Sequence, residues 1–531
     1  MSIIDWIIVV LFLVALTSIG FIFSKRNKNM EDYFLGGRSM STWMVALAAT
    51  GTSISAGTFV GSPELGFNTN LTYLLLCVGA IIGGLAVAAL VLPKLYKANT
   101  ITIYGYIGER FDEHSKRTTS AIFLLGQLFT SGSRLFIAAI AVSVMLYGSI
   151  SFKFIMYSII ILGLLSTVYT MAGGIKGLIY IDTFQMLLVI GTGVVALLLI
   201  YFTMNDTLGI NDIFNTLQHG QVKDSSGAWV DGNKLQIFDT SLRMDVPYNL
   251  IGALIGCSIF KFAQFSTDHE FVQRQLTCKS VKSAGVSLVY SQILSLPVVL
   301  IFLGVGMLLY VKYVHTDPAA LAQMQGDARD LFPQYICHHI PTGVRGLMII
   351  GLLAAALSSF NSAINAMASS FVSDIYLPIR QKYGKSITTD SDQMSSSKKM
   401  VVLMGCVLTG FAIFTAFLQQ ESGLNLVDFA TGVMCFSYAG MLGVFMCALF
   451  TKRGSTASVT AALIVGVVVV LLMQPYIFGP LTEALFGTKL SIAWTWWCPI
   501  GSAISFVVCS LGKKTATVPA EDPKPITAAA E

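Results

Sequence analysis

The sequence contains few charged residues. Of 531 residues, 33 are Lys or Arg and 28 are Asp or Glu, so charged residues make up 11% of the chain, against about 25% in an average soluble domain. Hydrophobic residues reach 54%, and the mean hydropathy is +0.72. This composition excludes a water-soluble globular protein and predicts an integral membrane protein.

Histidine and paired cysteine are also scarce. The six His are few, and the nine Cys stand singly without a Cys-x-x-Cys pair, which disfavours zinc sites and disulfide frameworks. No membrane-spanning run holds paired acids, a His cluster or a Ser with a base, so the sequence predicts no enzyme. The net charge of +5 follows from basic loops, as shown below, and we expect no nucleic-acid partner.

What the chain does contain is a series of apolar runs long enough to cross a bilayer, which takes about 20 residues per helix. We count thirteen, near 3–23, 41–66, 71–93, 119–147, 151–171, 178–203, 248–267, 284–311, 343–372, 400–419, 426–450, 455–474 and 490–511. The runs predict an all-α integral membrane protein with about 13 transmembrane helices.

The loops between these runs predict the orientation of the chain. Cytoplasmic loops carry an excess of Lys and Arg. With the N-terminus outside, the predicted cytoplasmic loops hold 23 of the 33 basic residues and the external loops hold 8. We therefore expect a multi-pass protein of the cytoplasmic membrane, with its N-terminus outside and its C-terminus in the cytoplasm.

The runs also predict one transporter domain over residues 1–511, followed by a disordered cytoplasmic tail over 512–531. Within the domain we expect a leading helix at 3–23, a first repeat at 41–203, a second repeat at 248–450 and extra helices at 455–511. The two five-helix sets enter the membrane in opposite senses, because an odd number of spans separates their starts. Inverted repeats of this kind are typical of secondary transporters.

Two apolar stretches are rich in small hydroxyl residues and predict interrupted helices, one at 48–59 and one at 354–362. Irregular backbone at membrane depth is tolerated where it lines a cavity or binds an ion. Ala355, Ser358, Ser359 and Ser362 share one helical face, and the stretch from Gly51 to Ile54 can add carbonyl oxygens. Neutral oxygens suit a sodium ion that must leave again. The alternative is that Ser and Ala merely let two helices pack closely.

Asp182 lies at the predicted cytoplasmic start of a helix. It can satisfy the helix N-terminus, or it can stand on the path of the cation as a charged ligand.

Two cations lie inside apolar runs. Arg134 and Lys261 must face protein or water, because a charge in lipid costs at least about 2.5 kcal/mol. Arg134 can pair internally with Asp182 or Glu64. Alternatively, both cations receive an anionic group of a substrate, and the planar fork of Arg134 suits a carboxylate.

With these residues the chain resembles the sodium:solute symporter family. The motifs that carry the resemblance are Glu31 to Ser39, Gly173-Gly174 with Ile181 to Gln185, Val272-Gln273-Arg274, and Ala354 to Ser362 with Ser373 to Tyr376. They follow the order of the family and cover roughly 25–460. The resemblance implies a LeuT-like fold with inverted five-helix repeats and one extra leading helix.

The resemblance also implies site residues. The family's principal sodium site maps onto Gly51, Ile54, Ala355, Ser358 and Ser359. A second sodium position of some members maps onto Asp182, Ser358, Asn361 and Ser362, where Asn361 departs from the hydroxyl of sialic-acid-type members. Substrate contacts map onto Ser53, Ser55, Thr58 and Arg134, and Cys77, Phe59 and Phe265 are expected to line the same cavity. Lys261 and Gln264 replace the Asn and the inner-gate Tyr of sugar transporters, which disfavours a simple sugar site.

The sequence therefore predicts a sodium-coupled symporter that imports a small polar solute, with an anionic solute such as a sialic acid or another organic acid favoured. Sugar, polyol or amino acid symport is the alternative. A channel would need a continuous polar pore, and a sensor would need a signalling domain; neither is evident. The expected partners are sodium, the solute and the lipid bilayer, and the expected state is a monomer.

Overall fold

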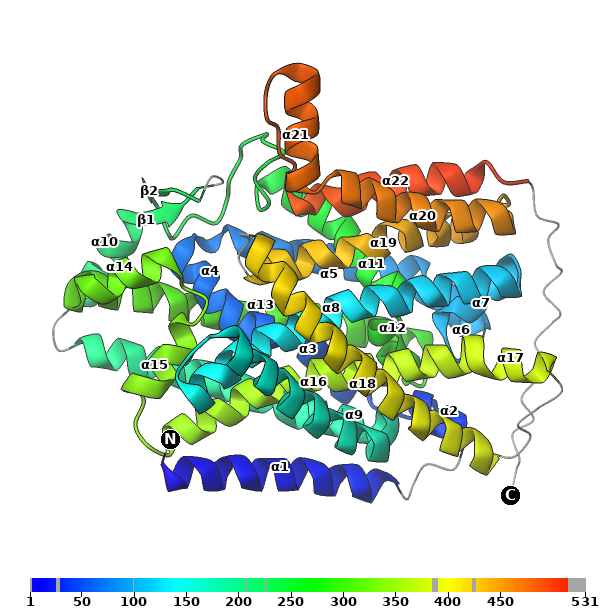
Figure 1. Cartoon of the computed structure of the whole chain (residues 1–531), viewed down its shortest axis with the longest axis horizontal. Coiled ribbons are helices and arrows are strands. Elements are labelled where there is room, and N and C mark those ends of the chain that lie inside the picture. Colours follow the sequence, from blue (N-terminus) through cyan, green and yellow to red (C-terminus); the bar gives the residue numbers. More distant parts are fainter. Residues whose placement is uncertain are drawn as a thin grey trace.

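The computed structural model describes residues 2–24, 29–98, 100–205, 208–224, 227–383, 390–422 and 426–513. It is a bundle of helices whose long axes run mostly in one direction, horizontally in Figure 1. The predicted tail lies outside the described residues from position 514 onward.

The first half of the chain forms the following elements: α1 (Ile3–Ser24), α2 (Met30–Leu35), η1 (Gly36–Arg38), α3 (Thr42–Ser53), η2 (Gly57–Gly61), α4 (Ser62–Asn68), η3 (Leu71–Tyr73), α5 (Leu74–Leu90), α6 (Leu92–Ala98), α7 (Ile103–Arg110), α8 (Glu113–Tyr147), α9 (Phe152–Asn205), α10 (Ile210–Gln218) and the antiparallel strands β1 (Gly220–Lys223) and β2 (Trp229–Gly232). Long helices dominate because a helix pairs every backbone N–H and C=O group of an apolar run internally, as the interior of a bilayer requires.

The second half forms η4 (Gly252–Cys257), α11 (Ser258–Thr267), α12 (His269–Leu276), α13 (Val281–Thr316), α14 (Pro318–Gly326), α15 (Leu331–His339), α16 (Val344–Ser370), η5 (Phe371–Tyr376), α17 (Leu377–Lys382), α18 (Asp390–Ser422), α19 (Leu426–Phe450), α20 (Thr456–Leu472), α21 (Pro475–Phe486) and α22 (Trp494–Ser510). Every predicted apolar run overlaps one of these helices.

The number of membrane spans stays a prediction. By length and composition, seven helices of the described chain can cross a bilayer, or nine if each of two bent pairs counts as one span. Two shorter apolar helices, Ile3–Ile19 and Phe152–Val168, add to these. The second of them and the span that follows it belong to α9, which is kinked at Gly174 (φ 59°, ψ −174°). Only Gly adopts this backbone conformation readily, because a Cβ would clash there.

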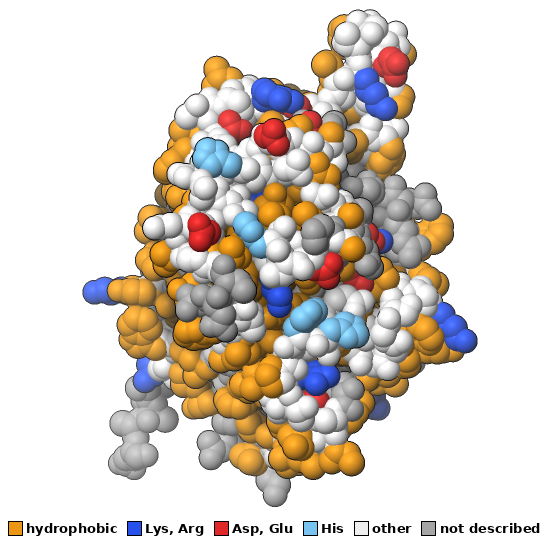
Figure 2. Space-filling view, turned by 90° about the vertical axis from the view of Figure 1, so that its left-hand side faces the viewer, with side chains coloured by type: hydrophobic (Ala, Val, Ile, Leu, Met, Phe, Trp, Pro, Cys, Tyr) orange, Lys and Arg blue, Asp and Glu red, His pale blue; other side chains and the backbone are white. Residues whose placement is uncertain are grey.

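Large hydrophobic side chains on the outside of the bundle mark a surface for lipid. Ile7, Leu11 and Val14 of α1 and Leu187 and Leu198 of α9 are among the exposed examples. Several short elements lie at the two ends of the long axis instead, with α10, β1, β2, α14 and α15 at one end and α2, α6, α7 and α17 at the other, while α21 (Pro475–Phe486) projects from the side of the bundle (Figure 1). The first of these ends carries charged and His side chains in its middle and hydrophobic side chains along its edges (Figure 2). The arrangement fits a membrane whose plane is perpendicular to the long axis.

The first predicted helix interruption is present. Helix α3 ends at Ser53, Ile54 has an extended backbone (φ −90°, ψ 93°), and the segment Gly57–Asn68 continues at an angle of 58°. Gly51, Thr52 and Ser53 end the helix with residues of weak helix propensity, which explains the break.

The second predicted interruption, at 354–362, is wrong, because α16 runs unbroken from Val344 to Ser370. Two of its Ser hydroxyls bond within the helix: Ser362 Oγ donates to the carbonyl of Ser358 at 2.6 Å, and Ser359 Oγ donates to that of Ala355 at 3.4 Å. Ala is the best helix former, and neither Gly nor Pro occurs between Leu352 and Ser370. A hydroxyl-rich stretch is therefore compatible with a continuous helix.

The second half of the chain is interrupted elsewhere, at Asp268. Its backbone is extended (φ −92°, ψ 114°), and its side chain caps α12 by accepting the N–H of Glu270 at 2.9 Å. Residues 268–278 are all buried, so the cytoplasmic loop predicted at this place is an internal half-helix. Its end is tied to the start of α3, since the Met40 N–H donates to the Thr277 carbonyl at 3.1 Å.

Candidate functional site

The candidate ion site lies where the broken helix α3 meets α16. A Cβ placed on Gly51 would lie 3.5 Å from Ser358 Oγ and 3.5 Å from the backbone carbonyl oxygen of Asp182, so three helices approach one another at Gly51. Because α3 ends at Ser53, the carbonyls of its last turn lose the amide donors that a longer helix would supply. Ala355, Ser358 and Ser359 are buried on the facing helix. The arrangement concentrates backbone and hydroxyl oxygens in one place.

Asp182 adds a carboxylate to this place. It is fully buried in α9 after the kink at Gly174, rather than at the start of a helix. Its Oδ1 accepts the hydroxyl of Ser358 at 2.6 Å, and its Oδ2 accepts Nη2 of Arg274 at 2.6 Å. The same Arg274 nitrogen contacts the hydroxyl of Ser362. Asp182 thus joins the predicted ion ligands, and Arg274 of α12 already supplies a positive charge there.

Asn361 points to a different neighbour. Its Oδ1 accepts the hydroxyl of Thr170 at 2.9 Å, and its Nδ2 has no hydrogen-bond partner within the described chain. An amide nitrogen cannot bind a cation, so Asn361 contributes to a second ion site only through an oxygen that Thr170 already uses.

The predicted substrate contacts of the first broken helix lie at its interruption. Ser53 and Ser55 flank Ile54; Ser53 Oγ is buried without a partner in the described chain, and Ser55 Oγ accepts the N–H of Gly57 at 3.1 Å. Thr58 follows in η2 and is buried. A Cβ on Gly57 would lie 3.8 Å from Ile137 of α8, so this segment adjoins the helix that carries Arg134.

Arg134 is buried in α8 and forms an ion pair with Glu270 of α12. Its Nη1 lies 3.2 Å from both Oε1 and Oε2 of Glu270, and its guanidinium lies over the ring of Phe271 at 5.9 Å. The expectation that an internal partner would be Asp182 or Glu64 is therefore wrong. Asp182 binds Arg274, and Glu64 accepts the backbone N–H of Leu426 at 3.3 Å.

Lys261 of α11 has a different environment. Its Nζ donates to Oε1 of Gln264 at 2.9 Å and lies over the rings of Phe260 and Phe265 at 5.6 and 5.8 Å. Lys261 interacts electrostatically with Arg134 and with Cys77 of α5. No carboxylate of the described residues lies within ion-pair distance of Lys261, so its charge is not neutralised by an acid.

Three functional candidates escaped the sequence prediction: Glu270, Asp268 and Arg274. Asp268 accepts Nε2 of Gln127 at 2.8 Å and the hydroxyl of Tyr438 at 2.6 Å, which links α8, α12 and α19. The available signal was the run Asp268-His269-Glu270 directly after an apolar stretch.

The structure thus forms two neighbouring groups of predicted residues. The oxygen-rich group comprises Gly51, Ile54, Asp182, Ala355, Ser358, Ser359 and Ser362 on α3, α9 and α16. The cationic group comprises Cys77, Arg134, Lys261 and Gln264 on α5, α8 and α11. The interruption between α3 and η2, with Ser53, Ser55 and Thr58, belongs to the same broken helix as Gly51.

Comparison with known proteins places this geometry in context. The chain is 26% identical over 466 residues to the sodium/sialic acid symporter SiaT of Proteus mirabilis, covering 87% of each chain. It is 25% identical over 506 residues to sodium/glucose cotransporter 1 of Sus scrofa, covering 91% of this chain and 73% of that one. Sequence identity alone therefore does not separate the two solute classes.

The fold comparison agrees. A solved structure of a Na⁺-coupled sialic acid symporter in its substrate-bound outward-open state superposes with a TM-score of 0.77 and 24% identity, covering 97% of this chain and all of that one. The LeuT-like fold predicted from the sequence is confirmed. The profile of the sodium:solute symporter family matches residues 33–466. The chain belongs to the sodium:solute symporter family.

Proposed function

We propose that this protein couples the inward movement of sodium to the import of a small anionic solute, a sialic acid or another organic acid. The single observation that carries the anionic preference is Lys261, a half-buried cation with no acidic partner within the described residues. An anion brought by the solute would neutralise this charge, which is costly to leave unpaired away from water. The match to the sialic acid symporter SiaT covers 87% of that protein, against 73% of sodium/glucose cotransporter 1, which supports the same class.

In this proposal the two cations have different tasks. Arg134 is already neutralised by Glu270, so it positions polar groups of the solute through its remaining N–H donors. Lys261 supplies the net positive charge that attracts a carboxylate. Ser53, Ser55, Thr58, Cys77 and Gln264 complete the proposed solute site.

Sodium is the coupling ion, and we propose that it binds between α3 and α16. Carbonyl oxygens of Gly51, Ile54 and Ala355 and the hydroxyls of Ser358 and Ser359 would form the site. Bound sodium would connect the broken helix to the continuous one and so favour one conformation over the other. Each sodium ion that moves inward releases about 2.3 kcal/mol per 100 mV of membrane potential. Asp182 and Ser362 are the candidates for a second ion, in competition with Arg274.

The membrane arrangement belongs to the proposal. The loop charges support an N-terminus outside and a C-terminus in the cytoplasm. One transporter domain of two inverted repeats that works as a monomer completes the proposal. With this orientation, the end of the molecule that holds α10, α14 and α15 faces outward.

The test compares charged solutes with neutral analogues of the same shape. Purified protein in sodium buffer is screened by thermal unfolding, because a ligand that binds the folded state raises its stability. N-acetylneuraminic acid and other carboxylates should raise the unfolding temperature, and their methyl esters should not. Any solute that passes is then tested for sodium-dependent uptake into vesicles.

A variant assigns the effect to Lys261. Lys261→Met keeps the length of the side chain and removes its charge, so we expect at least a tenfold weaker apparent affinity for the carboxylate. Lys153→Met changes an exposed lysine outside the site and should have no effect. Equal stabilisation by an acid and its ester, or an unchanged affinity in Lys261→Met, would contradict an anionic solute. Stabilisation by glucose, inositol or proline instead would favour the sugar, polyol or amino acid alternative.

A further inference from the structure

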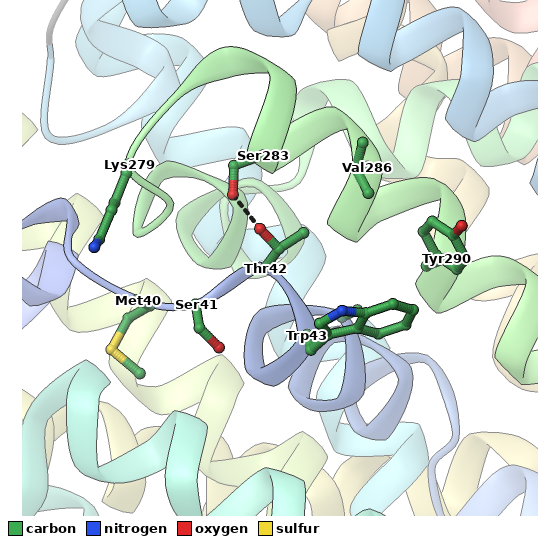
Figure 3. A pocket seen from close by; sticks show the side chains of 9 residues that line it. Met40, Ser41, Thr42, Trp43, Lys279, Ser283, Val286 and Tyr290 are labelled. Atoms are coloured by element: carbon green, nitrogen blue, oxygen red, sulfur yellow. Dashed lines mark hydrogen bonds between the residues drawn. The ribbon is translucent and has the colours of Figure 1, made fainter.

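A groove of about 550 Å³ opens between the start of α3 and the start of α13, at the opposite end of α3 from the break at Ile54. Figure 3 shows the side chains that line it. They are Met40, Ser41, Thr42, Trp43, Ala46, Lys279, Ser283, Val286 and Tyr290. With the orientation proposed above, this end of both helices is on the cytoplasmic side of the membrane.

The groove is polar at one end and aromatic at the other. Lys279 lies at one end and Trp43 and Tyr290 at the opposite end, with the hydroxyls of Thr42 and Ser283 between them (Figure 3). The two rings pack together with centroids 4.9 Å apart. The side chains thus change from charged to hydroxyl to aromatic along the groove, as the chemistry of a phospholipid changes from headgroup to acyl chain.

The polar end carries positive charge that no acid neutralises. Lys279 is exposed, and within the described residues neither it nor the nearby Lys282 forms an ion pair. The hydroxyls of Thr42 and Ser283 lie 2.5 Å apart, and either can be the donor. Ser283 also lies within hydrogen-bonding reach of the Cys278 thiol. When Ser283 donates to Thr42, the hydroxyl hydrogen of Thr42 can turn to an acceptor in the groove. The charge and the free donor are complementary to a phosphate.

The aromatic end presents exposed apolar surface. The side chains of Trp43 and Tyr290 are 59% and 42% exposed, although both rings are large and apolar. Tyr290 lies roughly 13 Å along α13 from its first residue, at about 1.5 Å per residue. This distance leads from the headgroup layer into the hydrocarbon edge, where Trp and Tyr are enriched. Val286 lines the stretch between the two layers.

We propose that this groove binds one anionic phospholipid of the cytoplasmic leaflet. Lys279 and a hydroxyl of the Thr42–Ser283 pair hold the phosphate, and an acyl chain lies along Val286, Tyr290 and Trp43. Basic pockets between transmembrane helices on the cytoplasmic side suit anionic headgroups. The proposal is independent of the identity of the solute and uses the proposed orientation only to name the leaflet.

Lipid binding can be measured on the whole protein in detergent, without transport. Phosphatidylglycerol should raise the unfolding temperature by several degrees more than phosphatidylcholine with the same acyl chains. Glycerol 3-phosphate at the same concentration should have little effect, because it lacks the chain that fills the aromatic end. Equal shifts with both lipids would overturn the proposal, and a full shift with glycerol 3-phosphate would show a phosphate site without a lipid.

Matched variants locate the effect. Lys279→Gln should abolish the difference between the two lipids, whereas Lys282→Gln, an exposed lysine outside the groove, should keep it. A phosphatidylglycerol with brominated acyl chains should quench part of the Trp fluorescence, and Trp43→Phe should remove that part. With both variants folded normally, two results would contradict a phospholipid in this groove: a Lys279→Gln variant that still prefers phosphatidylglycerol, or quenching that is unchanged in Trp43→Phe.

Discussion

Arg134 of α8 and Glu270 of α12 form a buried ion pair, with one guanidinium nitrogen 3.2 Å from both carboxylate oxygens. The pair joins a helix of the first repeat to the half-helix that follows the break at Asp268. Gln127 of α8 supports it, since its Nε2 also contacts Oε2 of Glu270 at 3.3 Å. The pair therefore contributes both to the packing of the bundle and to the charge beside the proposed solute site.

Removing either partner should be worse than removing both. Arg134→Gln and Glu270→Gln each leave one buried charge without its partner, which costs about 3–5 kcal/mol. The double variant leaves two neutral amides, and we expect it to lose about 2 kcal/mol, less than either single variant. Thermal unfolding of the four proteins in one detergent measures this coupling. Additive losses, within about 0.5 kcal/mol, would mean that the pair does not act as a unit.

A substitution at Gly51 should weaken ion binding without lowering the stability of the protein. The Cβ of Gly51→Ala would meet Ser358 Oγ and the Asp182 carbonyl at 3.5 Å, an ordinary contact, and Ala favours a helix by up to about 1 kcal/mol. We expect a folded protein of equal or higher stability that needs at least tenfold more sodium for half-maximal stabilisation, because the methyl group occupies the space beside Ser358. Gly191→Ala, where a Cβ meets nothing within 4 Å, is the control. An unchanged sodium response in Gly51→Ala argues against an ion between α3 and α16.

The contact between α4 and α13 has no room for a side chain. A Cβ on Gly306 would lie 2.0 Å from the carbonyl oxygen of Pro63, and backbone atoms cannot move aside cheaply. We expect Gly306→Ala to lose about 3 kcal/mol or more and to express poorly, which size-exclusion chromatography and thermal unfolding would measure. Gly410→Ala, with open space around it, should behave like the unmodified protein. A normal Gly306→Ala protein would mean that these helices are farther apart.

Lys234 should make stability depend on pH. It lies in the loop before the second repeat, outside the membrane spans, where its Nζ donates to the carbonyls of Phe67 and Thr69 at 2.6 and 3.2 Å under the ring of Tyr310. Burial lowers the pKa of Lys234 to about 7, from 10.5 for an ordinary lysine. Between these values the unfolded chain binds more protons than the folded one. Stability should therefore rise with pH from about 7 to 10 and stay flat with respect to this group below 7.

Lys234→Met isolates this effect, because it fills the same space without a titrating group. Between pH 7.5 and 9 the unfolding free energy of the unmodified protein should rise by up to about 1.4 kcal/mol per pH unit relative to the variant. Unfolding temperatures at matched pH values give the comparison. Parallel curves for the two proteins would show that Lys234 titrates normally.

Much of the fold follows from the sequence because its physical causes are local. The apolar runs dictate helices, and the weak helix formers Gly51, Thr52 and Ser53 mark the break that follows them. The helix at 354–362 is intact, and the hydroxyls of Ser359 and Ser362 bond to carbonyls of their own helix, which composition does not reveal. Hydroxyl content alone is therefore a weak indicator of an interruption.

The partners of the buried charges could not be predicted in the same way. Arg134 and Glu270 are far apart in sequence, and nothing local indicates which acid Arg134 meets. The run around Asp268 resembles a solvated loop in the sequence, because the partners of its acids lie on other helices: Gln127 and Tyr438 donate hydrogen bonds to Asp268, and Arg134 pairs with Glu270. Assigning these partners requires the tertiary structure. That Arg134 and Lys261 are unusual cations is evident from the sequence, because both lie inside apolar runs.

The backbone bond between Met40 and Thr277 has a mechanical consequence. It connects the residues before α3 to the residue after α12, so these two half-helices are coupled at this end of the molecule. To open a passage at this end, the protein must either break the Met40–Thr277 hydrogen bond or move α3 and α12 together. In the second case a single displacement would uncover the ion and the solute together, and slippage, the escape of one cargo without the other, would be rare.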